Sequence, residues 1–205
     1  ALDANTTGSN NVGIGAGALT SNTDANSNTA VGYNSLIGNT TGASNTALGN
    51  NAGYGASANA NVTGSNNLYL GNNAVGSSSS ASNEITLGNG SIGTIRCQVQ
   101  TISSLSDARD KTDIVDSADG LDLINLLRPR KFTWAMRETS ANNGKTELGF
   151  IAQEIDEALG NKNDYIHAVL HSNPDKLEAA YGRFIPILVK AVQELSAKVT
   201  ALEAG

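Results

Sequence analysis

Residues 28–36 read Asn-Thr-Ala-Val-Gly-Tyr-Asn-Ser-Leu, and variants of this motif occur on both sides of it. The glycines at the centre of five aligned copies lie 17, 17, 22 and 17 residues apart, at Gly15, Gly32, Gly49, Gly71 and Gly88. Self-similarity at a fixed period is typical of solenoids and repeat arrays. Each copy has a short alternating apolar stretch followed by Gly, Asn or Ser, which indicates a short strand and a turn rather than a helix.

A single coil of this kind buries little, so stacking of coils or association with identical chains must supply the core. Plain disorder is the alternative for a segment so rich in Asn, Gly and Ser, but disorder would not keep a 17-residue register. The longer interval between Gly49 and Gly71 predicts a loop inserted around residues 53–65. Residues 8–93 resemble the head repeats of trimeric autotransporter adhesins and similar repeats in phage tail fibres. The resemblance implies a β-roll or β-solenoid that trimerises side by side.

The distribution of charge also divides the chain into two unlike parts. Residues 1–105 contain only Asp3, Asp24, Glu84 and Arg96, whereas the other 12 basic and 16 acidic residues lie in 106–205. The net charge of −6 argues against a nucleic-acid partner. The single cysteine rules out an intrachain disulfide, and no apolar run is long enough to insert into a membrane. We expect neither a cofactor nor a metal, since the histidines lack a third ligand with suitable spacing.

The junction between the two halves contains a serine and a lysine five positions apart. Residues 94–105 alternate apolar and polar side chains and are predicted to be a connecting strand. Ser106 and Lys111 follow directly. A serine hydroxyl becomes a nucleophile when a base takes its proton, and a lysine is such a base when its surroundings favour the neutral amine. From spacing alone, the simpler interpretation is that Ser106 caps a helix or turn while Lys111 lies on the surface.

The second half reads as an ordinary mixture of helices and strands. We predict a helix over 117–127 with Ser117 as its N-cap, ended by the Arg-Pro pair that follows. Strands over 131–136 and 147–151 are predicted to form a hairpin around the Asn-Asn-Gly turn at 142–144. A helix over 153–159 and a short strand over 163–170 complete this region.

The C-terminal segment, about 182–204, has the pattern of a coiled coil. Its apolar residues step by 3, 4, 3, 4 and 3 positions, at Ile185, Leu188, Val192, Leu195, Val199 and Leu202. Barely three heptads would be marginal in isolation, so three copies packed together on a globular domain are favoured. The alternative is one long helix that lies on the core of its own domain.

The second half also resembles the peptidase S74 family over nearly all of residues 104–203. The resemblance rests on four motifs in order: Ser-Asp-Ala-Arg-Asp-Lys-Thr-Asp-Ile at 106–114, Gly-Leu-Asp-Leu-Ile-Asn-Leu-Leu-Arg-Pro-Arg-Lys-Phe-Thr-Trp at 120–134, Leu-Gly-Phe-Ile-Ala-Gln-Glu-Ile at 148–155 and Leu-Val-Lys-Ala-Val-Gln-Glu-Leu at 188–195. That family is the intramolecular chaperone at the C-terminus of phage tail spikes and fibres. It implies a domain that trimerises, guides folding of the upstream β-fibre and then cuts itself off.

The resemblance assigns a catalytic dyad to Ser106 and Lys111 and site-organising roles to Asp107 and Arg109. A serine hydroxyl reaches the preceding carbonyl through a five-membered ring, whereas attack on its own carbonyl needs a strained four-membered ring. Cleavage between Leu105 and Ser106 is therefore favoured if the serine acts in its own chain. If it acts across a trimer, the bond between Ser106 and Asp107 also becomes accessible.

The sequence thus predicts an all-β repeat over 1–93, a connecting strand over 94–105 and a small α+β domain over 106–205 that ends in a trimeric coiled coil. The predicted function is that of the C-terminal part of a phage tail fibre or spike, assembled in the host cytoplasm. Its expected activity is that of a single-turnover, self-cleaving serine endopeptidase. The expected partners are two identical chains, the upstream fibre segment and a host surface receptor. The alternative is a permanent trimer cap on a host-binding fibre that never cuts; a glycan hydrolase is disfavoured because the first half lacks paired carboxylates.

Overall fold

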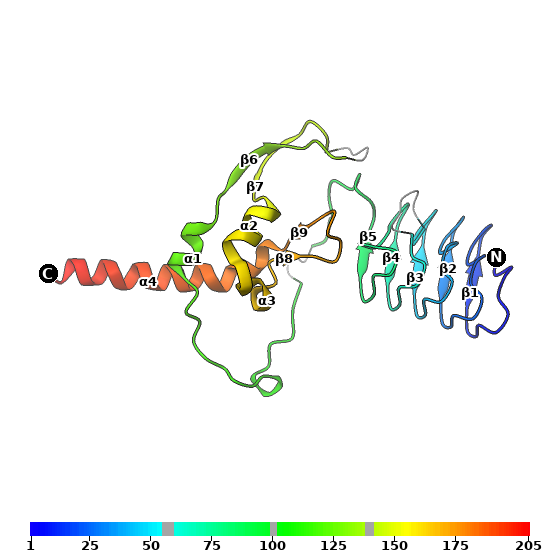
Figure 1. Ribbon diagram of the computed structural model, residues 1–205, viewed down its shortest axis with the longest axis horizontal. Helices are drawn as coiled ribbons and strands as arrows, with labels where there is room; N and C mark the ends of the chain where they lie inside the picture. The colour runs from blue at the N-terminus through cyan, green and yellow to red at the C-terminus, as the bar shows by residue number, and fades with distance from the viewer. Residues whose placement is uncertain (55–59, 99–101, 138–141) are drawn as a thin grey trace. The chain divides into compact units, whose positions relative to one another are not determined.

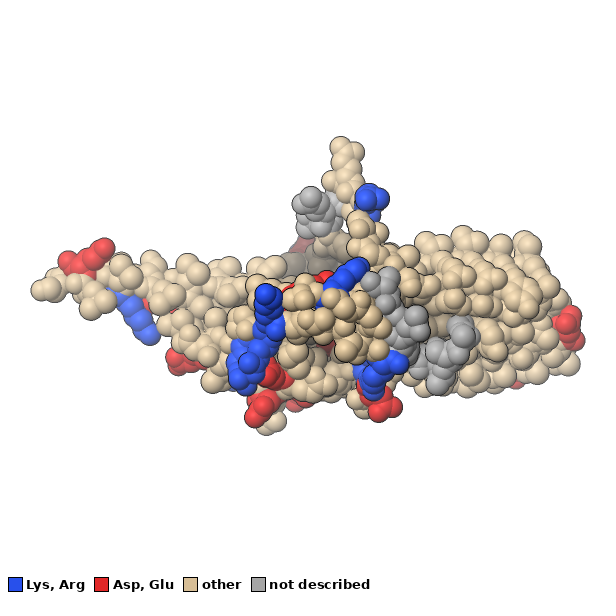
Figure 2. Space-filling view, turned by 90° about the horizontal axis from the view of Figure 1, so that it is seen from above, with Lys and Arg blue, Asp and Glu red and all other residues tan. Residues whose placement is uncertain are grey.

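The computed structural model describes residues 1–54, 60–98, 102–137 and 142–205. The chain divides into two compact units, which are described separately (Figure 1). The first comprises Ala1–Gly93 with Met136–Asn143, and the second comprises Thr94–Ala135 with Gly144–Gly205. On the face shown in Figure 2, charged side chains are scarce over the first unit and gather over the second, as the sequence requires.

The first unit is a β-solenoid, which confirms the interpretation of the repeat. Its sheet consists of five parallel strands in sequence order, β1 (Val12–Ile14), β2 (Thr29–Val31), β3 (Thr46–Leu48), β4 (Leu68–Leu70) and β5 (Ile85–Leu87). The register pairs Val12 with Thr29, Thr29 with Thr46, Thr46 with Leu68 and Leu68 with Ile85. Each strand therefore lies one repeat from the next, and the longer repeat falls between β3 and β4. Of the loop predicted over 53–65, residues 55–59 lie outside the described residues.

Strands β2, β3 and β4 each bury their central side chain in the solenoid and point their two flanking side chains outward, as the alternation of a strand dictates. The interior is narrow, so small residues dominate a core made of Ala18, Leu19, Ala30, Leu36, Ala47, Ala52, Tyr69 and Ala74. The outward positions leave apolar side chains exposed along the sheet, at Val12, Ile14, Leu48, Leu70, Ile85 and Leu87.

One bulky residue enters this narrow core through a compensating substitution. Tyr69 occupies the inward position that is alanine in β2 and β3, and it is fully buried. Gly53 stands at the repeat position held by Leu36 in the preceding coil. A Cβ at residue 53 would lie 2.9 Å from the Tyr69 ring and 2.6 Å from Leu36 Cδ2. The tyrosine therefore fills space that a leucine side chain occupies elsewhere.

Eight asparagines form two hydrogen-bonded ladders along the solenoid, and all of them except Asn5 and Asn11 are buried. The first ladder consists of Asn5, Asn22, Asn39 and Asn61. From Asn22 onward, the side-chain Nδ2 of each asparagine donates to the Oδ1 of the asparagine one coil earlier and to the carbonyl three residues ahead. In the second, each Oδ1 accepts from the backbone N–H one coil later, and the N–H of Glu84 ends the series Asn11, Asn28, Asn45 and Asn67. Asparagine thus acts here as a core residue, because its amide satisfies backbone groups that no side chain of this narrow coil could otherwise reach.

The glycines aligned in the sequence allow neighbouring coils to approach closely. Gly32 has φ of 137°, and a Cβ on it would lie 2.3 Å from the carbonyl oxygen of Gly49 in the next coil. Any L side chain there would be strained by the backbone and blocked by the neighbour.

The second unit contains short helices, two small antiparallel sheets and one long helix. Its elements are η1 (Ala108–Asp110), α1 (Leu121–Leu126), β6 (Arg130–Thr133), β7 (Thr146–Gly149), α2 (Ala152–Leu159), η2 (Gly160–Lys162), α3 (Asn163–Ile166), β8 (Val169–Leu170), β9 (Glu178–Ala179), η3 (Tyr181–Phe184) and α4 (Ile185–Glu203). Its core consists of Leu123, Ile155, Leu159, Ile166, Ala168, Val169, Phe184 and Ile187. The predicted hairpin is present, with Phe132 opposite Glu147 and Thr133 opposite Thr146.

Helix α4 presents two different faces. Ile187 and Ala191 are buried, and the helix packs against α1. The six residues of the predicted coiled-coil seam are all exposed in the single chain, at Ile185, Leu188, Val192, Leu195, Val199 and Leu202. The helix therefore does lie partly on the core of its own domain, and the seam is left free on the side next to the buried face.

Two local predictions were wrong, and a third falls partly outside the described residues. The helix expected over 117–127 begins only at Leu121, because the Ser117 hydroxyl accepts the Asp119 N–H in a turn and does not cap the helix. Residues 163–166 form the short helix α3, and only 169–170 are a strand. No strand occurs in the described parts of 94–105, which are 94–98 and 102–105.

Candidate active site

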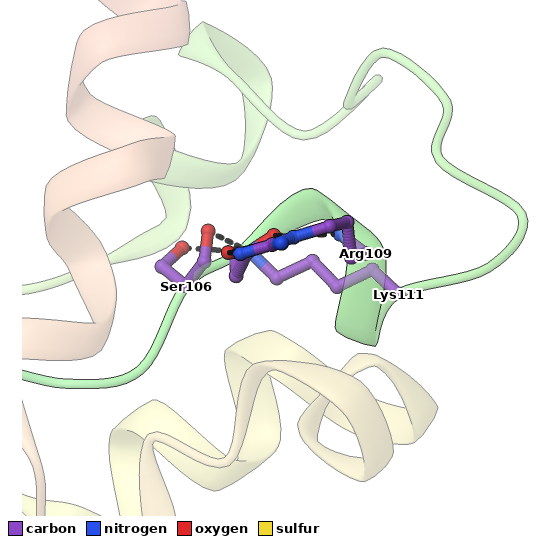
Figure 3. A network of polar contacts seen from close by, with 4 residues as sticks. Ser106, Arg109 and Lys111 are labelled. Carbon is purple, nitrogen blue, oxygen red and sulfur yellow. Dashed lines mark hydrogen bonds and ion pairs between the residues drawn. The ribbon is translucent and has the colours of Figure 1, made fainter.

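A tight turn brings the side chains of Ser106 and Lys111 together. Asp107 caps the short helix η1, where its carboxylate accepts the Arg109 N–H at 2.9 Å. The Asp110 N–H donates to the Asp107 carbonyl, and the Lys111 N–H donates to the Ala108 carbonyl, both at 3.2 Å. This single turn reverses the lysine side chain towards the serine (Figure 3). Lys111 Nζ then lies 2.6 Å from Ser106 Oγ and 3.3 Å from the Ser106 carbonyl oxygen.

Asp107 and Arg109 form an ion pair with each other beside this contact. Arg109 Nε lies 3.0 Å from Asp107 Oδ1, and its terminal nitrogen lies 2.6 Å from Oδ2. The side-chain hydrogen bond from Arg109, followed by its backbone hydrogen bond, lowers the pKa of Asp107, and the same pair raises the pKa of Arg109. The two residues therefore hold the turn in shape while their charges offset each other, so the carboxylate is not left to pair with the lysine.

The serine–lysine pair lies on a segment that the single chain leaves open to water. Every residue from 102 to 118 is exposed. A lysine acts as a general base where its surroundings disfavour the ammonium form, and burial is the usual cause. The single chain thus places a nucleophile and a base within hydrogen-bonding distance of each other. A further surface would have to cover the pair to exclude water from it.

The serine before the expected scissile bond was missed by sequence reasoning. Ser104 Oγ donates to the Leu105 carbonyl oxygen, although the separation of 3.4 Å is long. An attacked carbonyl develops negative charge on this oxygen, and a hydrogen-bond donor there stabilises it. Serine is too common in this chain for its type alone to have marked the position.

In 1–54, 60–98, 102–137 and 142–205, no three His, Cys, Asp or Glu side chains gather closely enough to hold a metal ion. The helices in those same ranges include none of the length and hydropathy that crossing a membrane would need.

Comparison with known proteins gives one match. Neither the curated proteins nor the solved structures contain a match to this chain. A family model does match, over well under half of the chain. The matched segment begins at the serine of the dyad and runs through the hairpin and α2. Residues 106–163 are thus similar to the peptidase S74 family, described as the chaperone of endosialidase.

Proposed function

We propose that this chain is the C-terminal part of a phage tail fibre or spike, whose last hundred residues are an intramolecular chaperone that releases itself by cutting next to Ser106. The observation that carries the proposal is the 2.6 Å contact between Lys111 Nζ and Ser106 Oγ, located where the match to the chaperone family begins. The β-solenoid directly upstream is the segment whose folding the chaperone would guide.

Trimerisation is supported by exposed apolar surfaces on each unit. The seam of α4 leaves six apolar side chains in water, and the outer face of the solenoid sheet leaves six more. Full burial of a side chain such as leucine or valine contributes about 1.5–3 kcal/mol. Two further copies of the same chain would cover both surfaces, because identical helices and identical sheets present matching apolar stripes to a threefold axis.

A chaperone at one end solves a problem that the solenoid creates. Successive coils have nearly the same sequence, so a pairing shifted by one whole repeat between chains would bury similar residues. Three chains that associate slowly are also exposed to aggregation. A second unit that trimerises through a distinctive helix would align the three chains in one register before the coils pack.

The proposed reaction begins with proton transfer from Ser106 Oγ to the neutral amine of Lys111. The oxygen attacks the carbonyl carbon of Leu105, and the Leu105 carbonyl oxygen takes the negative charge next to Ser104 Oγ. As the C–N bond breaks, the lysine ammonium returns the proton to the released nitrogen of Ser106, which leaves an ester between Leu105 and the serine side chain. Water then hydrolyses this ester and frees both fragments.

Release of the chaperone afterwards makes assembly irreversible. The trimer can then no longer unfold by reversing the pathway along which it formed, and the fibre persists because its barrier to unfolding is high. This accounts for placing a one-turnover peptidase at the start of the chaperone.

The test is a denaturing gel with intact mass spectrometry on the purified chain. Ser106→Ala and Lys111→Met should each remain full length, while the control variants Ser103→Ala and Lys176→Met should behave like the parent, since both control residues are exposed and outside the turn. Parent fragments with the masses of 1–105 and 106–205 would place the cut before Ser106. A parent that stays full length would exclude the peptidase and leave a permanent trimer cap.

A further inference from the structure

The exposed segment that carries the dyad enters the folded core of the second unit at three consecutive residues. Residues 102–118 are all exposed, whereas Asp119 and Gly120 are buried and Leu121 begins α1. Whatever fixes these three residues therefore fixes the point from which the dyad segment extends.

Glu194 of α4 contacts the last two residues of this entry point, Gly120 and Leu121. Its Oε2 accepts the Leu121 N–H at 2.8 Å and so caps α1, whose N-cap residue has no side-chain cap of its own. The fit is close, because a Cβ on Gly120 would lie 2.6 Å from each of the two carboxylate oxygens. Glycine at position 120 thus allows a carboxylate from a distant helix to reach the start of α1.

Asp119 is held from the other side, by residues of η2 and α3. The Tyr165 hydroxyl donates to its Oδ2 at 2.7 Å, and Lys162 forms an ion pair with its Oδ1. The hydrogen bond from Lys162, followed by that from Tyr165, lowers the pKa of Asp119, so the carboxylate is charged and fully bonded. The entry point is therefore anchored to two separate parts of the core.

The anchoring face of α4 lies directly beside its predicted trimer seam. Ile187, Ala191 and Glu194 are spaced by four and three positions, which places them on one face of the helix. Each is followed by a seam residue, at Leu188, Val192 and Leu195. Association along the seam would therefore fix, through one rigid helix, where the dyad segment of each chain begins.

We propose that Glu194 is a positioning residue for self-cleavage, which transmits the assembly of α4 to the segment carrying Ser106 and Lys111. This inference rests on the proposed function of the chain. Glu194 contacts neither residue of the dyad; it acts through Leu121 and Gly120. Cleavage would then be fast only in chains whose α4 helices have associated, which delays the cut until the register of the fibre is set.

The experiment measures the first-order rate of self-cleavage after pulse-labelled cell-free synthesis of the full chain, with the trimer fraction determined in parallel by native mass spectrometry. Glu194→Ala should form trimers that cleave at least about tenfold more slowly than parental trimers, since small displacements of reacting groups reduce rates steeply. Glu194→Gln keeps an acceptor oxygen and should restore a rate within about threefold of the parent. Glu203→Ala, an exposed glutamate on the same helix, is the matched control.

Gly120→Ala provides a second variant that leaves α4 unchanged. Its added methyl group would displace the Glu194 carboxylate, so its trimers should also cleave slowly, and combining it with Glu194→Ala should add little further loss. Parental cleavage rates in trimers of Glu194→Ala would overturn the positioning role. If Glu194→Ala forms no trimers, parental rates in Gly120→Ala trimers would overturn it instead. A parent that never cleaves would contradict the proposed function itself, which is a different outcome.

Discussion

Replacing one buried asparagine of the solenoid should cost far more than replacing an exposed one. Asn45 is fully buried, and its side chain makes three hydrogen bonds: Nδ2 donates to the Gly64 carbonyl at 2.8 Å, and Oδ1 accepts from both the backbone N–H and the Nδ2 of Asn67 at 3.1 Å. Asn45→Ala removes all three and leaves buried backbone groups without partners. At about 1 kcal/mol for each net hydrogen bond, the free energy of unfolding should fall by about 3 kcal/mol.

The measurement is urea unfolding in a Ser106→Ala background, so that every sample remains one intact chain. Far-UV circular dichroism follows both units, whereas the fluorescence of Trp134, the only tryptophan of the sequence, follows the second unit, so a change seen by circular dichroism alone reports on the solenoid. In thermal unfolding, a loss of about 3 kcal/mol corresponds to a fall in Tm of about 12–24 °C for a unit of about 100 residues. The tryptophan transition should stay where it is in the parent.

Asn50→Ala is the matched control, because Asn50 is an exposed asparagine of the same solenoid with a single side-chain contact, to Asn72 at 3.2 Å. Its cost should stay below about 0.5 kcal/mol, as for most surface substitutions. If Asn45→Ala and Asn50→Ala destabilise the solenoid equally, the buried ladders do not hold the coils together, and the reasoning is refuted.

Three more outcomes follow from the geometry. Ser106→Ala co-expressed with Lys111→Met should give no cleaved chains, because the dyad contact is within one chain; fragments on a denaturing gel would show that the two groups act across chains. The pKa of Asp119 is lowered from its ordinary 3.8, so its contribution to stability is present above that pH and is lost as pH falls through the lower value. Acid unfolding followed by tryptophan fluorescence should therefore be less steep in Asp119→Asn, and identical curves would contradict this. Gly32→Ala should destabilise the solenoid by about 2 kcal/mol or more in circular dichroism, whereas Gly90→Ala should not, because no atom lies within 4 Å of where its Cβ would be.

The periodic features of the chain could be predicted from sequence because they are local. Alternation over three residues and a repeated glycine predicted the short strands and their spacing, and the interval of 22 residues located the longer coil. The Asn-Asn-Gly turn predicted the hairpin in the same way. The pairing of Ser106 with Lys111 was predicted from the family resemblance alone, because their spacing by itself favoured a surface lysine; the structure shows that one turn of η1 separates the two groups.

The interior of the solenoid and the anchoring of the dyad segment could not be predicted in this way. Asparagine is usually a turn or surface residue, and only the stacking of coils shows that Asn28 or Asn45 is enclosed. The contact between Glu194 and Leu121 spans 73 residues, so no local pattern indicates it. The same contact explains why the helix predicted from Ser117 begins later, because its acceptor comes from another part of the chain.

The second asparagine ladder has a direction, and this bears on how such solenoids change length in evolution. Each asparagine bonds forward to the following coil, so a coil can be inserted before any other coil and will find the same partners. Glu84 occupies the last such position, and its carboxylate turns back to accept the N–H and hydroxyl of Ser77 in its own coil. Duplication of a 17-residue block upstream of Glu84 would therefore lengthen the solenoid without new interactions. A block added after Glu84 would meet a carboxylate that already accepts from Ser77 and that has no N–H to donate to a carbonyl, as Asn45 and Asn67 have. Genes for such solenoids can thus grow or shrink by whole repeats upstream of Glu84.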